Sequence, residues 1–235
     1  FNDMVSTPKH FSANNEEHNR GECKVVAPEK ILREYYLASF EACVREGGAA
    51  SIMAAYNAIN GVPCCCNGWL LTDVLRKDWG FDGYVVSDCG GVYQIWSHHK
   101  YAETLEQAAS LAIKAGLDLE CGDNVYIEPL ANALEEGLIS MADLDLAVSR
   151  VLTSRMKLGL FDPVELNPYS SLGEEVIGCE KHRSLALEAA RKSAVLLKND
   201  GILPLGKESL KRIAVLGINA AKCELGDYSG VPTIR

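Results

Sequence analysis

Strand-like and helix-like segments alternate along much of the chain, and this order constrains the fold more than any other feature. Apolar runs of strand character occur at residues 51–56, 84–87 and 117–119. Between them, residues 69–78 and 103–115 carry apolar side chains at helical spacing. Parallel strands joined by helices produce such an order. We therefore expect an α/β fold with a parallel sheet, either a (β/α) barrel or a doubly wound sheet.

Three further helices flank this alternating segment. Residues 28–46 predict a helix with Pro28 near its start and two glycines at its end, and residues 125–136 predict another. The third covers residues 141–158, where Ser140 and Asp143 open the helix. Five apolar residues are expected to form one face of this third helix: Leu144, Val148, Val151, Leu152 and Met156.

The pattern changes after the third of these helices. Residues 161–180 contain prolines, serines and glycines without a clear period, which is typical of a linker. A helical stretch at 182–197 and a strand-like run at 213–216 follow. We therefore predict a first domain over residues 1–160, a linker over 161–180 and a second α/β domain that begins at 181.

Composition and charge exclude several classes of partner. Of the 235 residues, 48% are hydrophobic, which suffices for a packed core. The 32 acidic and 23 basic residues give a formal charge of −9, so nucleic acid is not an expected partner. No run approaches the roughly 18 apolar residues of a membrane span, so no membrane partner is expected. Because the chain starts without Met and stops soon after a strand-like run, we expect a piece of a longer protein, in which a missing leader says nothing about secretion.

The cysteines indicate packing rather than metal binding. Nine is an odd number, and the chain is too long for a disulfide scaffold. The run Cys64-Cys65-Cys66 lacks the paired spacing of a zinc site, so we expect these small residues to pack a loop. Phosphate-binding glycine loops and cofactor fingerprints are also missing from the sequence, and we expect neither a metal nor a cofactor.

Asp88 is the strongest candidate for chemistry. It follows the apolar run 84–87 and precedes Gly90-Gly91. Active sites of alternating α/β folds lie at the carboxyl ends of strands, so Asp88 is a candidate nucleophile or base. The alternative is an Asp that caps the next helix or closes a turn. Lys9-His10 and Tyr56-Asn57 follow strands or open loops in the same way, which favours one shared site.

Seven motifs occur in order along the chain: Thr7-Pro8-Lys9-His10-Phe11, residues 51–57, Asn60-Gly61-Val62-Pro63, residues 81–89, residues 157–161, residues 194–199 and Leu203-Pro204-Leu205. Together they resemble glycoside hydrolase family 3. The resemblance covers essentially the whole chain. It implies a (β/α) barrel, incomplete in this chain, followed by the beginning of an α/β sandwich, with the active site between the two domains.

The resemblance also implies roles for individual residues. Asp88 matches the nucleophile, which forms a glycosyl-enzyme intermediate that water releases with retained configuration. Lys9 and His10 match the pair that binds sugar hydroxyls, and Tyr56 and Met53 match contacts beside the nucleophile. The acid/base carboxyl group of such relatives belongs to the second domain and lies beyond this chain, so we expect little or no turnover from the 235 residues alone.

A loop after the Lys-His pair is expected to rim the sugar site. Its charged residues are Glu16, Glu17, His18 and Arg20. One branch of the family, which cuts N-acetylglucosaminides, places a His-bearing loop here, but the residues around His18 do not match that pattern. Glu120 lies at another strand end and could contact sugar or support a loop.

The residue after the nucleophile indicates the substrate. Many family glucosidases have Trp there, whereas Cys89 resembles the β-xylosidase branch. Cys121 follows the next strand and resembles the same branch, so the two cysteines are a candidate disulfide that narrows the site; two free buried thiols are the alternative.

The leading hypothesis is therefore a retaining exo-β-xylosidase, with α-L-arabinofuranosidase activity as an open addition, that acts on xylan-derived oligosaccharides. A β-glucosidase of the same family is the runner-up. An aldolase-like barrel with a Schiff base at Lys9 and a non-catalytic sugar-binding relative are alternatives of other classes. By family resemblance, the expected location is the periplasm or the outside of the cell.

Overall fold

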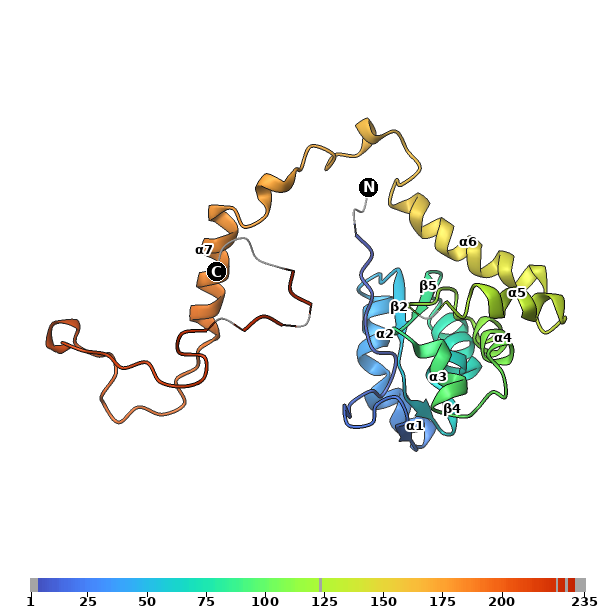
Figure 1. The fold of residues 1–235 in the computed structure, drawn as a ribbon, viewed down its shortest axis with the longest axis horizontal. Helices are drawn as coiled ribbons and strands as arrows, with labels where there is room; N and C mark the ends of the chain where they lie inside the picture. The colour runs from blue at the N-terminus through green and yellow to red at the C-terminus, as the bar shows by residue number, and fades with distance from the viewer. Residues whose placement is uncertain (1–3, 123, 223, 227, 231–235) are drawn as a thin grey trace. The chain divides into compact units, whose positions relative to one another are not determined.

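The computed structural model describes residues 4–122, 124–222, 224–226 and 228–230. The chain divides into two compact units, residues 1–172 and 173–235. Each unit is described by itself, and Figure 1 shows the elements of both.

A parallel sheet forms the centre of the first unit. Strand β2 (Ser51–Ala54) pairs in parallel with β5 (Tyr84–Ser87), and Ala54 lies opposite Ser87. Single parallel bridges join Phe11 to Ala54 on one side and Val86 to Leu119 on the other. The expected parallel sheet is confirmed, but residues 117–119 contribute one bridge instead of a full strand. Among the described residues, the sheet stays open and the barrel is not closed.

The first unit also has a small second sheet, two strands of which follow β2 in the chain. Its strands are β1 (Lys24–Val25), β3 (Ala58–Ile59) and β4 (Val62–Pro63), in the order β1-β3-β4. Strands β3 and β4 form a hairpin through Asn60 and Gly61, whose φ angles are 49° and 89°. Positive φ at both positions is what a tight Asn-Gly hairpin turn requires.

Helices surround the parallel sheet of the first unit and connect its segments. They are α1 (Glu29–Ile31), η1 (Leu32–Tyr36), α2 (Ala38–Arg45), η2 (Cys64–Cys66), η3 (Trp69–Asp78), α3 (Gly91–Ser97), α4 (Leu105–Ala115), α5 (Glu128–Glu135) and α6 (Met141–Lys157). The predicted helix at 28–46 corresponds to α1, η1 and α2 in succession, of which η1 is π-helical. Ser140 and Asp143 form the reciprocal capping box of α6, as predicted. Short 3₁₀ turns at Val164–Leu166, Glu174–Val176 and Lys207–Ser209 complete the helical segments.

The core lies between the sheet and these helices. Phe11 is fully buried, and its ring packs edge-on against Phe40 at 5.1 Å and near Trp79 at 5.8 Å. A glycine is required at position 83, because a Cβ there would lie 2.2 Å from the Ala50 carbonyl oxygen. Close packing of this kind fixes how β5 lies beside β2.

The expected apolar face of α6 is largely exposed. Val148 is 53% exposed and Met156 is 64% exposed, whereas the buried residues of the helix are Ala147 and Ser154. Leu144 is half-buried and packs against the core. The periodicity identified the helix correctly, but the described part of the chain offers too little apolar surface to cover all of that face.

The second unit contains helix α7 (Glu180–Ser193). The prediction of a helix up to residue 197 is wrong at its end, because Ala194 has extended backbone with φ −76° and ψ 120°. The prediction of a strand at 213–216 is also wrong for the described residues, which contain no partner strand for it. Ile213 and Leu216 are accordingly 73% and 89% exposed. A strand forms only when a neighbour takes up its backbone hydrogen bonds.

A buried ion triad ties together three elements of the first unit. The Asp118 carboxylate, whose side chain is 1% exposed, accepts from Arg76 at 2.6 Å and from Arg150 at 2.8 Å. It also accepts from the Val85 backbone amide at 2.8 Å. Burial raises the pKa of Asp118 and lowers that of Arg76 despite their attraction. Desolvation is therefore costly here, and the triad is favourable only while all of these bonds are made.

Removing the central carboxylate should strongly destabilise the first unit. Asp118→Ala leaves two arginines buried or half-buried without their partner, so we expect a loss of about 3–5 kcal/mol in the free energy of unfolding. Urea denaturation measures it. Asp82→Ala is the matched control, because the side chain of Asp82 is 82% exposed and pairs with Lys157 at 3.4 Å; about 0–1 kcal/mol is expected there. Equal losses in the two variants would contradict the role of the triad.

Candidate active site

Asp88 lies directly after β5, at the carboxyl end of the parallel sheet. Its backbone amide donates to the Ala54 carbonyl oxygen at 3.1 Å, which extends the pairing of β2 and β5 by one residue. The residue is 7% exposed. Its Oδ1 accepts from the Cys89 amide at 2.8 Å, whereas Oδ2 has no well-aligned hydrogen bond among the described residues. One carboxylate oxygen is thus held and the other is open to chemistry.

Gly90 and Gly91, which follow Asp88 and Cys89, are each favoured as glycine for a different geometric reason. Gly90 has φ 81°, a left-handed conformation that glycine adopts without strain. Gly91 begins α3, and a Cβ there would lie 2.8 Å from Cys65 Sγ. Cys65 belongs to η2, whose three cysteines are buried as predicted for a packed loop. Burial raises the pKa of each of these thiols, that of Cys64 to about 12, so they remain protonated and inert.

His10 faces the nucleophile candidate. Its Nε2 lies 3.1 Å from Asp88 Oδ2. Burial lowers the pKa of His10, and the nearby Lys9 and Arg20 lower it further, although Asp88 acts in the opposite direction. His10 therefore favours its neutral form, which has one ring nitrogen that donates and one that accepts. Lys9 precedes it in an exposed position.

Tyr56 joins the end of β2 to the loop after β5. Its hydroxyl donates to the Cys89 carbonyl oxygen at 2.6 Å. Burial raises the pKa of Tyr56, and Asp88 raises it further, so the phenol stays protonated. The Arg20 guanidinium lies 4.9 Å from the centre of the Tyr56 ring, a cation–π contact that brings the loop of residues 14–20 against the site.

His99 is a residue of this site that the sequence did not reveal. Its Nε2 lies 2.8 Å from the Tyr56 carbonyl oxygen, and because a carbonyl only accepts, Nε2 carries the proton. His99 follows α3, which begins three residues after Asp88. The contact joins residues 43 positions apart, and no local spacing indicates it. Tyr56 is therefore held at both its hydroxyl and its carbonyl.

Cys89 and Cys121 lie side by side at the edge of the site. Their sulfur atoms are 2.7 Å apart, and neither is part of a disulfide in this structure. The Ser87 hydroxyl accepts from the Cys121 amide at 2.9 Å, and the Gly90 amide donates to the Cys121 carbonyl oxygen at 2.8 Å. Cys89 is exposed. The strand ends thus bring the two cysteines together, and their pairing as a disulfide stays a prediction.

The remaining predicted residues have mainly local contacts. Glu16 accepts from the His18 amide at 2.8 Å, and Glu17 pairs with Arg20 at 3.1 Å, so these charges hold their own loop. Met53 lies half-buried in β2, opposite Val86.

Glu120 supports a loop, which is one of the two roles left open for it. Its two carboxylate oxygens accept from the amides of Val125 and Tyr126 at 2.9 Å and 2.8 Å. Both oxygens of Glu120 are therefore engaged by backbone amides of the loop that follows it.

The described residues contain no group of three or more His, Cys, Asp or Glu side chains placed to hold a metal ion. Their helices include none long and apolar enough to cross a membrane.

Comparison with protein families assigns the chain. Residues 2–154 match the glycosyl hydrolase family 3 N terminal domain, and residues 194–235 match the glycosyl hydrolase family 3 C-terminal domain. The chain belongs to glycoside hydrolase family 3.

Individual relatives agree with this assignment. A probable exo-1,4-beta-xylosidase of Aspergillus clavatus is 40% identical over 238 residues, which cover 97% of this chain and 30% of that protein. Probable beta-D-xylosidase 7 of Arabidopsis thaliana is 38% identical over 234 residues, which cover 95% of this chain and 30% of that protein. The chain therefore spans about a third of the length of these relatives.

Solved structures are similar over most of the chain. An exo-beta-xylosidase in complex with a xylobiose aziridine probe is 36% identical with a TM-score of 0.82, over 87% of this chain and 27% of that one. A beta-glucosidase from Listeria innocua in complex with glucose is also 36% identical, with a TM-score of 0.77 over 86% of this chain and 28% of that one. Both carry a sugar or a sugar-like probe.

The buried histidines should make stability depend on pH. Burial lowers the pKa of His99 as well as that of His10, so these two histidines bind fewer protons in the folded chain than in the unfolded chain as the pH falls through about 6.5. The free energy of unfolding should consequently fall as the pH drops from 7.5 to 5. Replacing His99 by Gln, which keeps a donor for the Tyr56 carbonyl, should reduce this fall in urea titrations at both pH values.

His182→Gln is the matched control, because His182 lies exposed in the second unit. Its pH dependence should equal that of the unmodified chain. An unchanged slope in His99→Gln would show that His99 does not contribute to it.

Proposed function

We propose that this chain carries the nucleophile side of the active site of a retaining exo-β-glycosidase, and that the enzyme is a β-xylosidase. The observation that carries the proposal is the Asp88 carboxylate, which is buried at a sheet edge, anchored through Oδ1 and 3.1 Å from His10 through Oδ2. The family and its β-xylosidase relatives support the sugar chemistry.

In the proposed reaction, Asp88 Oδ2 attacks the anomeric carbon of a terminal sugar. The new bond between Oδ2 and that carbon forms as the bond to the leaving oxygen breaks, and the leaving oxygen takes a proton from a general acid. Water then attacks the same carbon, gives its proton to the conjugate base and releases Asp88 as a carboxylate. The two displacements retain the configuration.

The neighbours of Asp88 suit these steps. A neutral His10 can donate to or accept from a sugar hydroxyl, and the side chain of Lys9 can donate to a hydroxyl oxygen. Tyr56 stays protonated and holds the Cys89 carbonyl, so the loop that carries the nucleophile is fixed before substrate arrives. The exposed position of Lys9 argues against a Schiff-base lysine, which needs a desolvated amine.

The acid/base carboxyl group is proposed to lie in a part of the protein outside these residues. The relatives are about three times as long as this chain, which leaves ample sequence to supply it. The 235 residues alone are accordingly expected to give little or no turnover.

We assign the preference for xylose to the corner beside Cys89. Xylose lacks the hydroxymethyl group of glucose, so a filled corner admits xylose and excludes glucose by contact. The sulfur atoms of Cys89 and Cys121, 2.7 Å apart, are proposed to form a disulfide that rigidifies this corner in an oxidising compartment. Such a compartment, the periplasm or the cell exterior, agrees with xylan-derived oligosaccharides as substrates.

A β-glucosidase of the same family is the second candidate. The Listeria innocua beta-glucosidase, with glucose bound, is as identical to this chain as the exo-beta-xylosidase is, at 36%. Activity on a panel of aryl glycosides separates the two candidates.

Covalent labelling tests the assignment of the nucleophile. A 2-fluoro-xylosyl inactivator should label the full-length protein stoichiometrically, and peptide mass mapping should place the label on Asp88. Asp88→Asn should abolish labelling and reduce kcat by at least about 10³-fold, as loss of a nucleophile does elsewhere.

Asp82→Asn is the matched control, because it removes an exposed carboxylate six residues earlier. It should label and turn over like the unmodified protein. Tight xylose binding without any adduct would instead indicate a non-catalytic sugar-binding protein.

The proposed disulfide has its own test. Non-reducing peptide mapping of protein from an oxidising compartment should show Cys89 cross-linked to Cys121, with Cys64, Cys65 and Cys66 as protected thiols for comparison. Replacing both Cys89 and Cys121 by Ala should lower the preference for xylosides over glucosides by roughly 10-fold or more, the usual effect of one missing group in a pocket. Two free thiols together with an unchanged preference would remove the proposal.

A further inference from the structure

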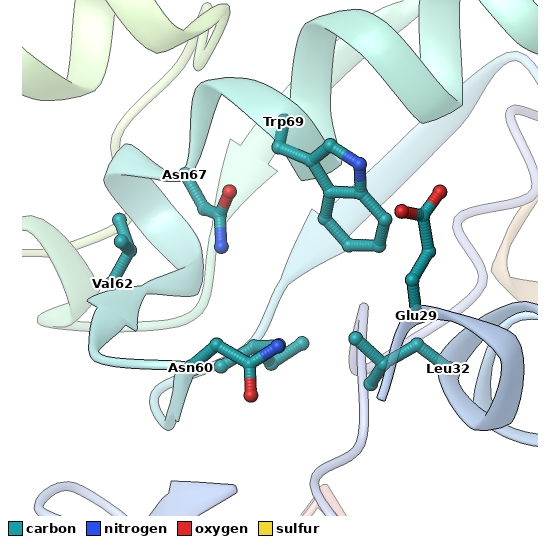
Figure 2. Close-up of a pocket in the computed structure, with 7 residues that line it drawn as sticks. Glu29, Leu32, Asn60, Val62, Asn67 and Trp69 are labelled. Atoms are coloured by element: carbon teal, nitrogen blue, oxygen red, sulfur yellow. The ribbon is translucent and has the colours of Figure 1, made fainter. Parts of the chain in front are cut away.

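The first unit has a cavity that is separate from the residues assigned to the active site. It has a volume of about 270 Å³ and is shown in Figure 2. Its walls come from the start of the helical segment at Glu29, the β3-β4 hairpin and the start of η3, and they comprise Glu29, Leu32, Ile59, Asn60, Val62, Asn67 and Trp69. None of these residues is among the contacts of Asp88, His10 or Tyr56 described above.

Apolar side chains form most of the cavity surface. Leu32 and Ile59 are 1% and 2% exposed and form a buried apolar part of its wall. Trp69 is half-buried, and in Figure 2 its indole ring lies between the Asn67 amide and the Glu29 carboxylate. An indole beside two polar groups offers both an apolar face and hydrogen-bond partners to one ligand.

The hydrogen bonds of the polar residues show which groups can reach a ligand. The Asn60 side chain is held by backbone, because its Oδ1 accepts from the Ala27 amide and its Nδ2 donates to the Ala27 carbonyl oxygen, both at 3.0 Å. Asn67 Oδ1 accepts from the Leu70 amide at 3.1 Å, which orients Nδ2 toward the cavity. Glu29 Oε1 accepts from Arg33 at 2.7 Å, and its other oxygen has no hydrogen bond among the described residues.

Arg33 fixes the charge of the cavity. Its guanidinium pairs with Glu29 at 2.7 Å and Asp78 at 2.9 Å, and it lies 5.6 Å from the centre of the Trp69 ring. Two carboxylates against one guanidinium leave a net negative charge at the rim. An anionic ligand is therefore disfavoured, and a neutral ligand with hydroxyl groups fits best.

We propose that this cavity is a second carbohydrate-binding site, which takes one pyranose unit of a neutral sugar. The C–H face of the sugar ring packs on Trp69, one hydroxyl accepts from Asn67 Nδ2 and another donates to Glu29 Oε2. The choice of xylose and xylobiose as probes rests on the proposed function, whereas the site itself rests on the cavity. The site holds an oligosaccharide on the protein and has no part in bond cleavage.

The test measures sugar binding while the active site is blocked by an inhibitor. Xylobiose is titrated by calorimetry into the full-length Asp88→Asn protein in the presence of a saturating non-covalent iminosugar inhibitor, so that binding outside the active site is recorded. We expect one further site with a dissociation constant of about 1 mM. Trp69→Ala should weaken it at least about 10-fold.

Asn67→Asp separates binding from folding. Aspartate keeps an oxygen that can cap Leu70 and replaces the donor by a second oxygen, so binding should weaken several-fold, and thermal denaturation of the same variant checks that it remains folded. Tyr101→Ala is the matched control, because it removes another aromatic residue, 45% exposed, and should leave binding unchanged. In all three variants, built with Asp88 intact, kcat on a small aryl xyloside should stay as in the parent.

The results distinguish this proposal from the proposed function. No saturable binding of xylobiose or of glucose to the blocked protein would overturn the second site, as would binding that survives both Trp69→Ala and Asn67→Asp. Failure to label Asp88 would overturn the nucleophile assignment alone, because the titration into Asp88→Asn does not depend on turnover.

Discussion

The parallel pairing of β2 with β5 is the interaction on which the site depends. Four residue pairs are in register, and the Asp88 amide extends the pairing to the Ala54 carbonyl. This register places Tyr56 and Asp88 on neighbouring strand ends. A slip by one residue would turn every side chain of β5 to the opposite face. The close approach of Gly83 to the Ala50 carbonyl, where a Cβ would lie 2.2 Å away, fits only the observed alignment.

Two buried carboxylates in this sheet have different surroundings and therefore different uses. Asp118 accepts from two arginines and a backbone amide, so its oxygens are saturated and it stabilises the fold. Asp88 has one oxygen anchored by the Cys89 amide and one that lies 3.1 Å from His10 Nε2, and His10 favours its neutral form. A carboxylate that is buried but incompletely satisfied costs stability, and active sites are where such a cost is tolerated. The contrast supports Asp88 as the reactive group.

Periodicity and capping residues predicted most elements of the first unit. The segments at 51–56, 69–78 and 84–87 are present, and the capping box at Ser140 is formed. Predictions that needed a distant partner were less successful. The run 213–216 has no strand beside it among the described residues, and much of the apolar face of α6 has no cover. Local patterns reveal an element, whereas its pairing depends on residues elsewhere in the chain.

The sequence by itself determined the local elements, the family and the set of polar residues at the strand ends, because each is encoded in short motifs and spacings. Only the tertiary structure decided how those residues are used. It showed that Glu120 supports a loop, that His99 holds the Tyr56 carbonyl and that Cys89 lies beside Cys121. Each of these contacts except that of Glu120 joins residues more than 30 positions apart. Such contacts arise from the packing of strands and helices, which no local pattern of residues specifies.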